Sequence, residues 1–513
     1  MLDSKIIELA TIDNLIGILT RIRANGGILG DILLDPTRDS EDASGHEARL
    51  ATLRILKASR NAQQLILKAT EKEIYRLKEE TSATILQRGI QSLPDDLVRE
   101  IFYAGFNLYG CSLGSESYPF KLSHVNRRFR TIALETPRIW TRLSNASSSA
   151  QLGYRIERSK AAWLNICVMA FGGADDYPCS VAEFLEIATP LSSRWESFEY
   201  VVRIPETTEY GTSYTYRALL YYPNVDAPHL TSFTWQIRYN EVTPESLGPP
   251  ATFFKHWNMP RLTHFDGLNV SIDAALFGSN LVSVTLEFES EYVTWDADEF
   301  DDTLGALASS TCLKHLSLKF AEDDFDHGNK VPITLLASLV ALNIAFSATP
   351  TRDFVTRFFT AVQMPMLTSM SVTVAIDDQT IGETIYGQHY TAIISSARHY
   401  PNLQKFALDF TGSQTPPAWN VIATFGQMLP SLQEVTLGGA GAWINFGRLT
   451  SPVSWRLFRL RASHKLTYDG LCRMAATDPG WGSCKIDIPD ERNLSTEAIC
   501  LLGDRLIYES CIS

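Results

Sequence analysis

Several features that define common protein classes are missing from this sequence. Its 513 residues include eight scattered cysteines without a CxxC pair, which argues against a zinc module or a disulfide scaffold and favours a reducing compartment. No uncharged apolar run reaches the roughly 18 residues that a transmembrane helix needs. Residues 1–22 carry Asp3, Glu8 and Asp13 and lack a basic region before an apolar run, unlike a signal peptide. We therefore expect a soluble protein of the cytoplasm or nucleus that binds no membrane.

Catalytic and metal-binding motifs are also missing. The ten histidines show no HxxxH or HExxH grouping, and no GxSxG elbow or P-loop occurs. The sequence GGAGAW at 438–443 lacks the third glycine of a dinucleotide loop, because Ile444 takes that place, so we interpret it as a turn. Two acidic runs, at 296–302 and 322–326, lack the glycine and glutamate positions of an EF-hand and are interpreted as solvated loops. We expect no enzyme activity and no cofactor.

Positive charge is in short supply over the chain as a whole. The formal net charge of −13 argues against a molecule whose whole surface binds nucleic acid, since that function needs a basic face. A local basic patch is compatible with this net charge. With 45% hydrophobic and 20% charged residues, the composition is that of an ordinary globular protein, and the length allows a large core or several domains.

Residues 1–92 carry helical patterns. Apolar residues cluster between Ile6 and Ile22 and again after a glycine-containing gap, which predicts two helices. The second helix, roughly 46–88, places Leu53, Leu67 and Leu77 near one face. Polar residues interrupt the heptad, so we favour packing within the chain over self-association as a coiled coil.

Residues 93–143 contain the most specific pattern, LPDDLVREIFYAGF followed by an insertion from Asn107 to Tyr118 and then PFKLSHVNRRFRTIALETPRIW. Pro94 suits the first turn of a helix, and the two aspartates after it complement the positive helix N-terminus. Apolar residues recur at helical spacing in both segments, and Pro137 stops the second one. The pattern predicts two short amphipathic helices.

This segment resembles an F-box, and in particular the F-box-like modules of large fungal families in which a coiled helix precedes the box and degenerate leucine-rich repeats follow it. The resemblance covers about 50 residues closely and the remainder by layout. It implies a small helical module that docks onto a Skp-type adaptor, which in turn attaches to a cullin scaffold, while the chain itself does no chemistry.

The resemblance also implies contact residues for the Skp-type adaptor. Two positions depart from the common pattern, because Phe129 stands where the family commonly has Trp and Asn126 where it commonly has Cys. The alternative is a helical packing unit without a partner; exposure of these residues on one face would favour the partner, and burial would favour packing. The candidate adaptor contacts are Leu93, Pro94, Leu97, Ile101, Phe102, Leu122, Val125, Phe129 and Trp140.

From about residue 150 a unit of the form apolar-x-x-apolar-x-apolar recurs, mostly at intervals near 30 residues. Such a period is typical of a solenoid, and the alternation within each unit predicts a short strand with one buried face. The copies begin at Trp163, Trp195, Leu230, Leu281, Leu313, Leu339, Leu367, Leu403 and Leu432, with weaker ones at Leu262 and Trp455.

The connections between these units contain plausible helices, as in GALASS (305–310), DFVTRFFTAV (353–362) and YTAIISSARH (390–399). The sequence therefore predicts a fold of the α plus α/β class: a helical segment at 1–92, an F-box-like module at 93–143, and an irregular leucine-rich-repeat horseshoe at 150–513. An all-β repeat domain is the alternative fold.

Two functional classes follow from this organisation. The first is a substrate-recognition adaptor of an SCF-type (Skp-cullin-F-box) ubiquitin ligase, with the module as a handle for the Skp-type adaptor and the repeats as the binder of an unknown protein substrate. The second is a repeat scaffold or regulatory binder outside any ligase. We also hypothesise that the acidic runs favour a basic target segment, with solubility as the alternative role.

Overall fold

The fold was analysed in a computed structural model of the chain, which describes residues 13, 16–17, 20, 43–108, 117–171, 177–204, 224–239, 254, 256–270, 280–288, 297–320, 333–347, 352–375, 400–411, 429, 431–439, 455–462, 471–473, 475–477, 481–482, 484–488 and 494–508. The chain divides into two compact units, Met1–Glu100 and Ile101–Ser513. The division falls inside one helix, α3 (Asp95–Leu108). Each unit is described by itself.

The first unit contains one long helix, α2 (Ala43–Ser92). Its described side chains are exposed almost throughout, with Ala62 a buried exception. Arg76 pairs with Glu73 and Glu80, one turn away on either side, and such pairs support an exposed helix. The predicted second helix at 46–88 is therefore present and longer at both ends, while most of the predicted first helix lies outside the described residues. No helix within the described residues combines the length and the apolar character that a bilayer span needs.

The segment after the insertion forms two helices where the sequence had predicted one. Helix α4 (Tyr118–Val125) ends at Asn126, whose backbone is extended, and α5 (Arg127–Leu134) begins directly after it. The Asn126 side chain accepts a hydrogen bond from the backbone N–H of Phe129 at 2.8 Å, which caps α5. A 3-10 turn at Pro137–Trp140 follows, so the prediction that Pro137 stops the helix is confirmed.

Among the described residues, fourteen strands form one sheet in which every neighbouring pair is parallel and almost every neighbour in space is the next strand in the chain. Parallel strands need connections that cross back over the sheet, and these connections supply the helices. The strands are β1 (Arg142–Ser144), β2 (Leu164–Phe171), β3 (Trp195–Ile204), β4 (Ser232–Tyr239), β5 (His264–Leu268), β6 (Ser283–Phe288), β7 (His315–Phe320), β9 (Ala341–Phe346), β11 (Ser369–Ala375), β12 (Lys405–Thr411), β13 (Glu434–Gly439), β14 (Leu457–Ala462), β15 (Lys485–Ile488) and β16 (Leu506–Tyr508).

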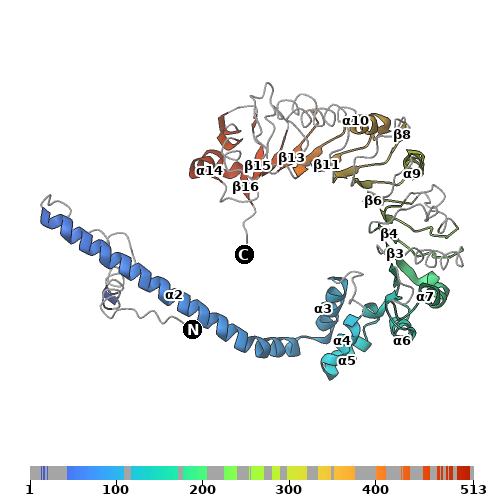
Figure 1. The fold of residues 1–513 in the computed structure, drawn as a ribbon, viewed down its shortest axis with the longest axis horizontal. Helices are drawn as coiled ribbons and strands as arrows, with labels where there is room; N and C mark the ends of the chain where they lie inside the picture. The colour runs from blue at the N-terminus through green and yellow to red at the C-terminus, as the bar shows by residue number, and fades with distance from the viewer. Residues whose placement is uncertain are drawn as a thin grey trace. The chain divides into compact units, whose positions relative to one another are not determined.

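Helices in this second unit cover one face of the sheet (Figure 1). They are α6 (Ser149–Ser159), α7 (Val181–Ala188), α9 (Ala297–Ser309), α10 (Arg352–Ala361) and α14 (Thr496–Leu502), with 3-10 turns at Thr189–Arg194 and Gly503–Arg505. The helices predicted from GALASS and DFVTRFFTAV are α9 and α10, whereas the one predicted from YTAIISSARH lies outside the described residues. A separate pair, β8 (Thr334–Leu335) and β10 (Val362–Gln363), lies in the connections.

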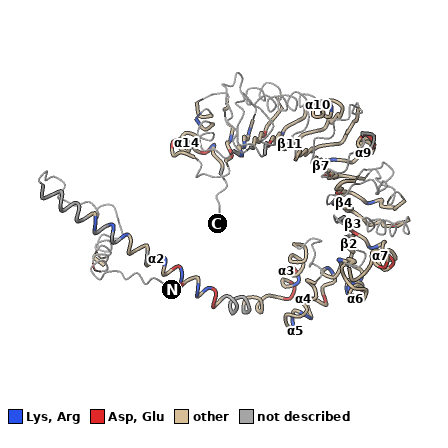
Figure 2. Tube along the Cα trace, viewed as in Figure 1, with Lys and Arg blue, Asp and Glu red and all other residues tan. Residues whose placement is uncertain are grey.

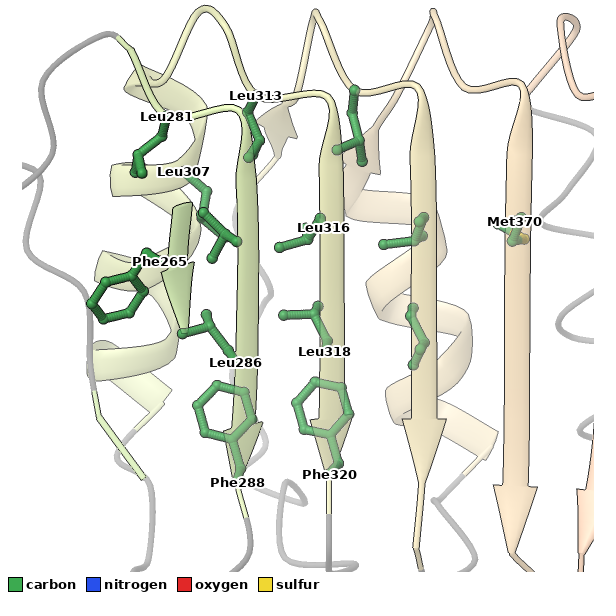
Figure 3. Packing of buried hydrophobic residues seen from close by; sticks show 14 of the residues in the cluster. Phe265, Leu281, Leu286, Phe288, Leu307, Leu313, Leu316, Leu318, Phe320 and Met370 are labelled. Carbon is green, nitrogen blue, oxygen red and sulfur yellow. The ribbon is translucent and has the colours of Figure 1, made fainter. Parts of the chain in front are cut away.

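The register of the sheet aligns the repeated apolar positions. Phe198 pairs with Phe233, Phe233 with Phe265 and Phe265 with Val284, and the same row continues through the later strands. Alternate side chains of a strand point to opposite faces, so this row is buried while the residues between its members lie on the other face. In Figure 3, Leu316, Leu318 and Phe320 of β7 lie on the face of the sheet that also carries Leu307 of α9. The core is thus a continuous apolar layer between the strands and the connecting helices.

One predicted strand position is wrong in detail. The sequence repeat starts at Trp163, but the structure pairs Leu164 with Trp195, and the register shifts between Leu164 and Asn165. Leu164 is buried and Trp163 is exposed as a result. The irregularity moves one residue to the opposite face, which a spacing rule does not detect.

Candidate partner-binding site

Helix α3 is apolar on two faces. One face is buried and carries Val98, Phe102 and Phe106. Leu97, Ile101 and Leu108 follow one another at separations of four and seven residues, which places them on a single stripe of the helix. Their exposed fractions are 51%, 53% and 87%, respectively. We call these three residues the α3 stripe.

The residues that lead into α3 explain where the helix begins. The carbonyl of Pro94 accepts a hydrogen bond from the backbone N–H of Val98 at 3.2 Å, so Pro94 closes the first turn. Asp95 and Asp96 occupy that turn, where negative charge is favoured. Pro94 itself is exposed and Leu93 is half-buried. Both predicted contacts thus lie at the N-terminal end of the helix that carries the stripe.

The predicted contacts on α4 and α5 differ in exposure. Val125, at the C-terminal end of α4, is 60% exposed. Leu122 and Phe129 are half-buried. The ring of Phe129 meets the buried ring of Phe102 edge-on, with 5.0 Å between their centroids. This contact ties α5 to the buried face of α3.

Two of the predicted contacts pack inside the chain. Phe102 is 2% exposed and Trp140 is 1% exposed. The indole N–H of Trp140 donates to the carbonyl of Ala133 at 2.7 Å, and the ring of Phe120 lies 5.2 Å from it. By the criterion of exposure, these two residues hold the helical module together, and the α3 stripe and Val125 are the candidate contact residues. Leu108 was missed in the sequence, although its spacing of 11 residues from Leu97 would have identified it.

Arginine side chains line the junction between the helical module and the first strand. The guanidinium of Arg138 lies 3.5 Å from the ring centre of Tyr103, and that of Arg142 lies 4.4 Å from the ring centre of Phe106. Arg155, which is buried, donates to the carbonyl of Arg142 at 2.6 Å. Buried Nε and Nη1 atoms of Arg142 have no hydrogen-bond acceptor, so this guanidinium is held by the aromatic ring.

The face of the sheet opposite the helices carries polar residues. At its N-terminal end, Glu199 of β3 and Asp266 of β5 flank Thr234 of β4 in one register row. No hydrogen bond or ion pair joins either carboxylate to another described residue. Burial, and then the negative charge of Glu199, raise the pKa of Asp266 above its ordinary value of 3.8. Among the described residues, these two carboxylates therefore have no partner cation.

The C-terminal end of the same face is charged but internally paired. Glu434 of β13 lies between Lys405 at 2.9 Å and Arg459 at 3.7 Å, and Arg459 also donates to Asp487 at 2.8 Å. Asp409 lies over Gly438 on the neighbouring strand, where a Cβ atom would collide with its carboxylate. The ion pairs bridge β12 to β15 in sequence.

Within the part of the chain that the structure describes, no three His, Cys, Asp or Glu side chains are arranged to hold a metal ion. The acidic run at 322–326 lies outside the described residues. Residues 297–302 of the other run form the first turns of α9, so the prediction of a loop there is wrong. Burial raises the pKa of the Cys484 thiol to about 12, which keeps it protonated and inert.

The chain was compared with known proteins. No protein-family model matches the sequence. No curated protein matches it either. Among solved structures, the chain is similar to one in the crystal structure of the Rad7 and Elc1 complex in yeast, with 12% sequence identity, coverage of 87% of this chain and 97% of that chain, and a TM-score of 0.35.

Proposed function

We propose that this chain is a substrate-recognition adaptor of an SCF-type ubiquitin ligase. In this proposal the α3 stripe binds a Skp-type adaptor, which connects the chain to a cullin, and the sheet binds a protein target. The chain itself does no chemistry and works in the cytoplasm or nucleus. The observation that carries the proposal is the exposure of three large apolar side chains on a helix whose opposite face is already buried.

The energetics of the stripe support a docking role. Burying an exposed leucine or isoleucine side chain stabilises a complex by about 1.5–3 kcal/mol. The three residues of the α3 stripe therefore offer several kilocalories per mole to a partner with a matching groove, as in other complexes in which a helix binds a groove. The core contacts of the helix come from the buried residues Val98, Phe102 and Phe106, so about half of the Leu97 and Ile101 surfaces and most of the Leu108 surface are left for a partner.

The sheet supports the second half of the proposal. We interpret its repeated strands and crossing helices as irregular leucine-rich repeats, in which the helices cover one face and leave the other for a target. Polar residues of that open face alternate with the buried positions along the strand in β6 and β7. An extended face of this kind suits recognition of a protein rather than of a small molecule.

The first test is a pull-down of the full chain with a purified Skp-type adaptor, comparing the wild type with the double variant Leu97→Ala, Ile101→Ala. We expect the double variant to lose at least about a hundredfold in affinity, because about 3 kcal/mol of apolar burial is removed. The matched control is Leu335→Ala, Met366→Ala, which removes two exposed apolar side chains far along the chain.

Thermal unfolding of all three proteins shows whether each variant remains folded, and we expect it to, because the changed side chains are exposed. Binding that the control keeps and the stripe variant loses supports the proposal. If the folded wild-type chain does not bind the adaptor at all, the ligase function is wrong, and a scaffold outside any ligase becomes the better account.

A further inference from the structure

Positive charge is concentrated in one segment of this acidic protein. Residues 117–160 hold 9 of the 45 Lys and Arg residues but only 2 of the 58 Asp and Glu residues. The segment therefore carries a formal charge of +7, and the rest of the chain carries −20. Figure 2 marks these Lys and Arg positions in blue along α4, α5 and α6. This difference in charge affects the surface of the folded chain only where the charged side chains are exposed.

Three of these cations lie exposed on α4 and α5. Lys121 lies on α4, and Arg127 and Arg130 lie three residues apart on α5, which places the two arginines on one face of that helix. No ion pair or side-chain hydrogen bond joins any of the three to another described residue. Four other arginines of the segment differ, because Arg138, Arg142, Arg155 and Arg158 lie over aromatic rings.

The position of the two α5 arginines is unfavourable for the isolated chain. They belong to the first turns of the helix, where the macrodipole disfavours positive charge and where no acidic residue is present. Two like charges three residues apart also repel each other. The Asn126 side chain already caps the helix, so the arginines are not needed to complete it. Their cost to the folded chain points to a role outside it.

We infer that the surface formed by Lys121, Arg127 and Arg130, which we call the basic surface, docks against an acidic face of a protein partner. The inference rests on the proposed function: the partner is the Skp-type adaptor that binds the α3 stripe. Carboxylates of that partner supply the negative charge that the first turn of α5 lacks.

The observations favour a protein over a nucleic acid as this partner. Val125 is exposed four residues after Lys121 on the same helix, so apolar and basic side chains occupy one face of α4. A protein interface uses both kinds of contact, whereas phosphate binding needs only the charges. The −20 charge of the remaining chain also repels a long polyanion.

A basic surface of this kind acts mainly on the rate of association. Complementary charges steer two proteins toward each other, and the effect falls as salt shortens the Debye length from about 10 Å at 0.1 M to about 3 Å at 1 M. The basic surface therefore makes adaptor binding fast and salt-dependent, while the α3 stripe governs how slowly the complex dissociates.

The test measures association and dissociation rates of the full chain with the purified Skp-type adaptor at about 0.1 M and about 1 M salt. The variant is Arg127→Glu, Arg130→Glu, for which we expect an association rate at least about tenfold lower at the lower salt and a nearly flat salt dependence. The dissociation rate should change less. Glutamate suits the first turn of a helix, so the variant should unfold at the same temperature as the wild type or higher.

Two comparisons make the result decisive. Lys314→Glu, Arg456→Glu reverses two exposed cations elsewhere and changes the net charge equally, so it should bind at a nearly normal rate. Lys121→Glu tests the basic surface from α4, independently of α5. Unchanged association by both basic-surface variants overturns the inference while leaving the proposed function intact, whereas absence of adaptor binding by the wild type removes both. Tighter binding to single-stranded RNA than to the adaptor, lost in the same variants, would replace the protein partner with a nucleic acid.

Discussion

Glu199 and Asp266 place two negative charges in one register row of the sheet, which destabilises the folded chain. The two carboxylates occupy alternate strands with only Thr234 between them, and no cation pairs with either one among the described residues. Like charges across a sheet destabilise it. Burial and this repulsion together raise the pKa of Asp266, so the folded chain binds a proton at that carboxyl more tightly than the unfolded chain does.

We predict that Asp266→Asn raises the free energy of unfolding at neutral pH. Because the folded-state pKa is raised, the contribution of Asp266 to stability is fully present below its ordinary pKa of 3.8 and is lost as pH rises through the folded-state pKa. The asparagine variant has no such loss. Urea unfolding of both proteins at neutral pH and near pH 3.8 should show a difference that shrinks in acid.

Glu199→Gln serves as the matched control for this prediction. It removes the same repulsion from the other side, so it should also stabilise the chain at neutral pH. A difference between Asp266→Asn and the wild type that is equally large at both pH values would show that the side-chain replacement, and not the proton, is responsible.

The residues of the candidate site show what side-chain spacing can and cannot predict. The pattern of Leu97, Ile101 and Phe102 correctly predicted an amphipathic helix, and burial divides these residues between two faces. When a helix has apolar residues on two faces, its sequence alone does not show which face the rest of the chain buries. Leu108, the most exposed member of the stripe at 87%, has the same spacing, but it was assigned to the insertion that begins at Asn107 and was therefore not identified.

At the scale of elements, Gly105 controls how closely α4 approaches α3. A Cβ atom at Gly105 would collide with the hydroxyl of Tyr118 and would lie 2.9 Å from its ring atom Cζ. Gly153 of α6 is also inside a helix, but a Cβ atom there would meet nothing within 4 Å. Both glycines therefore lie inside helices, but only Gly105 lacks space for a side chain.

We predict that Gly153→Ala stabilises the chain by about 0.5–1 kcal/mol, because alanine is the better helix former. Gly105→Ala should instead destabilise it by about 1–3 kcal/mol, the usual cost of overpacking. Chemical denaturation of both variants measures the two changes.

A double-mutant cycle with Tyr118→Leu isolates the steric contact. In the Tyr118→Leu background the added methyl group has space, so Gly105→Ala should lose most of its cost. If Gly105→Ala is destabilising to the same extent in both backgrounds, Tyr118 is not the cause.

Most strands were predictable from sequence, and the reasons for the failures are local. The copies from Trp195 to Trp455 form strands that align in register. They were predictable because apolar residues at every second position indicate a strand with one buried face. Strands β1, β15 and β16 were missed since they are only three or four residues long. The break at Asn126 was missed because the apolar spacing continues through it, although asparagine is a preferred helix cap.

At the scale of the whole molecule, apolar burial is concentrated in the second unit. Rings stack along the register, with 5.5 Å between the centroids of Phe198 and Phe233 and 5.3 Å between those of Phe288 and Phe320. Helix α2 contributes almost none of this burial, since its described side chains are exposed. Its stability comes from local pairs such as Glu73 and Arg76, which are individually weak.

We predict from this contrast that deletion of residues 1–92 leaves the unfolding transition of the remaining chain unchanged to within about 0.5 kcal/mol, the range of ordinary surface changes. Circular dichroism should lose helical signal, because a 50-residue helix is removed, while the urea midpoint stays the same. Deletion of residues 1–108 is the control: it also removes the buried rings of Phe102 and Phe106 and should lower the midpoint. An equal fall in both deletions would mean that α2 supports the folded chain and is not an independent element.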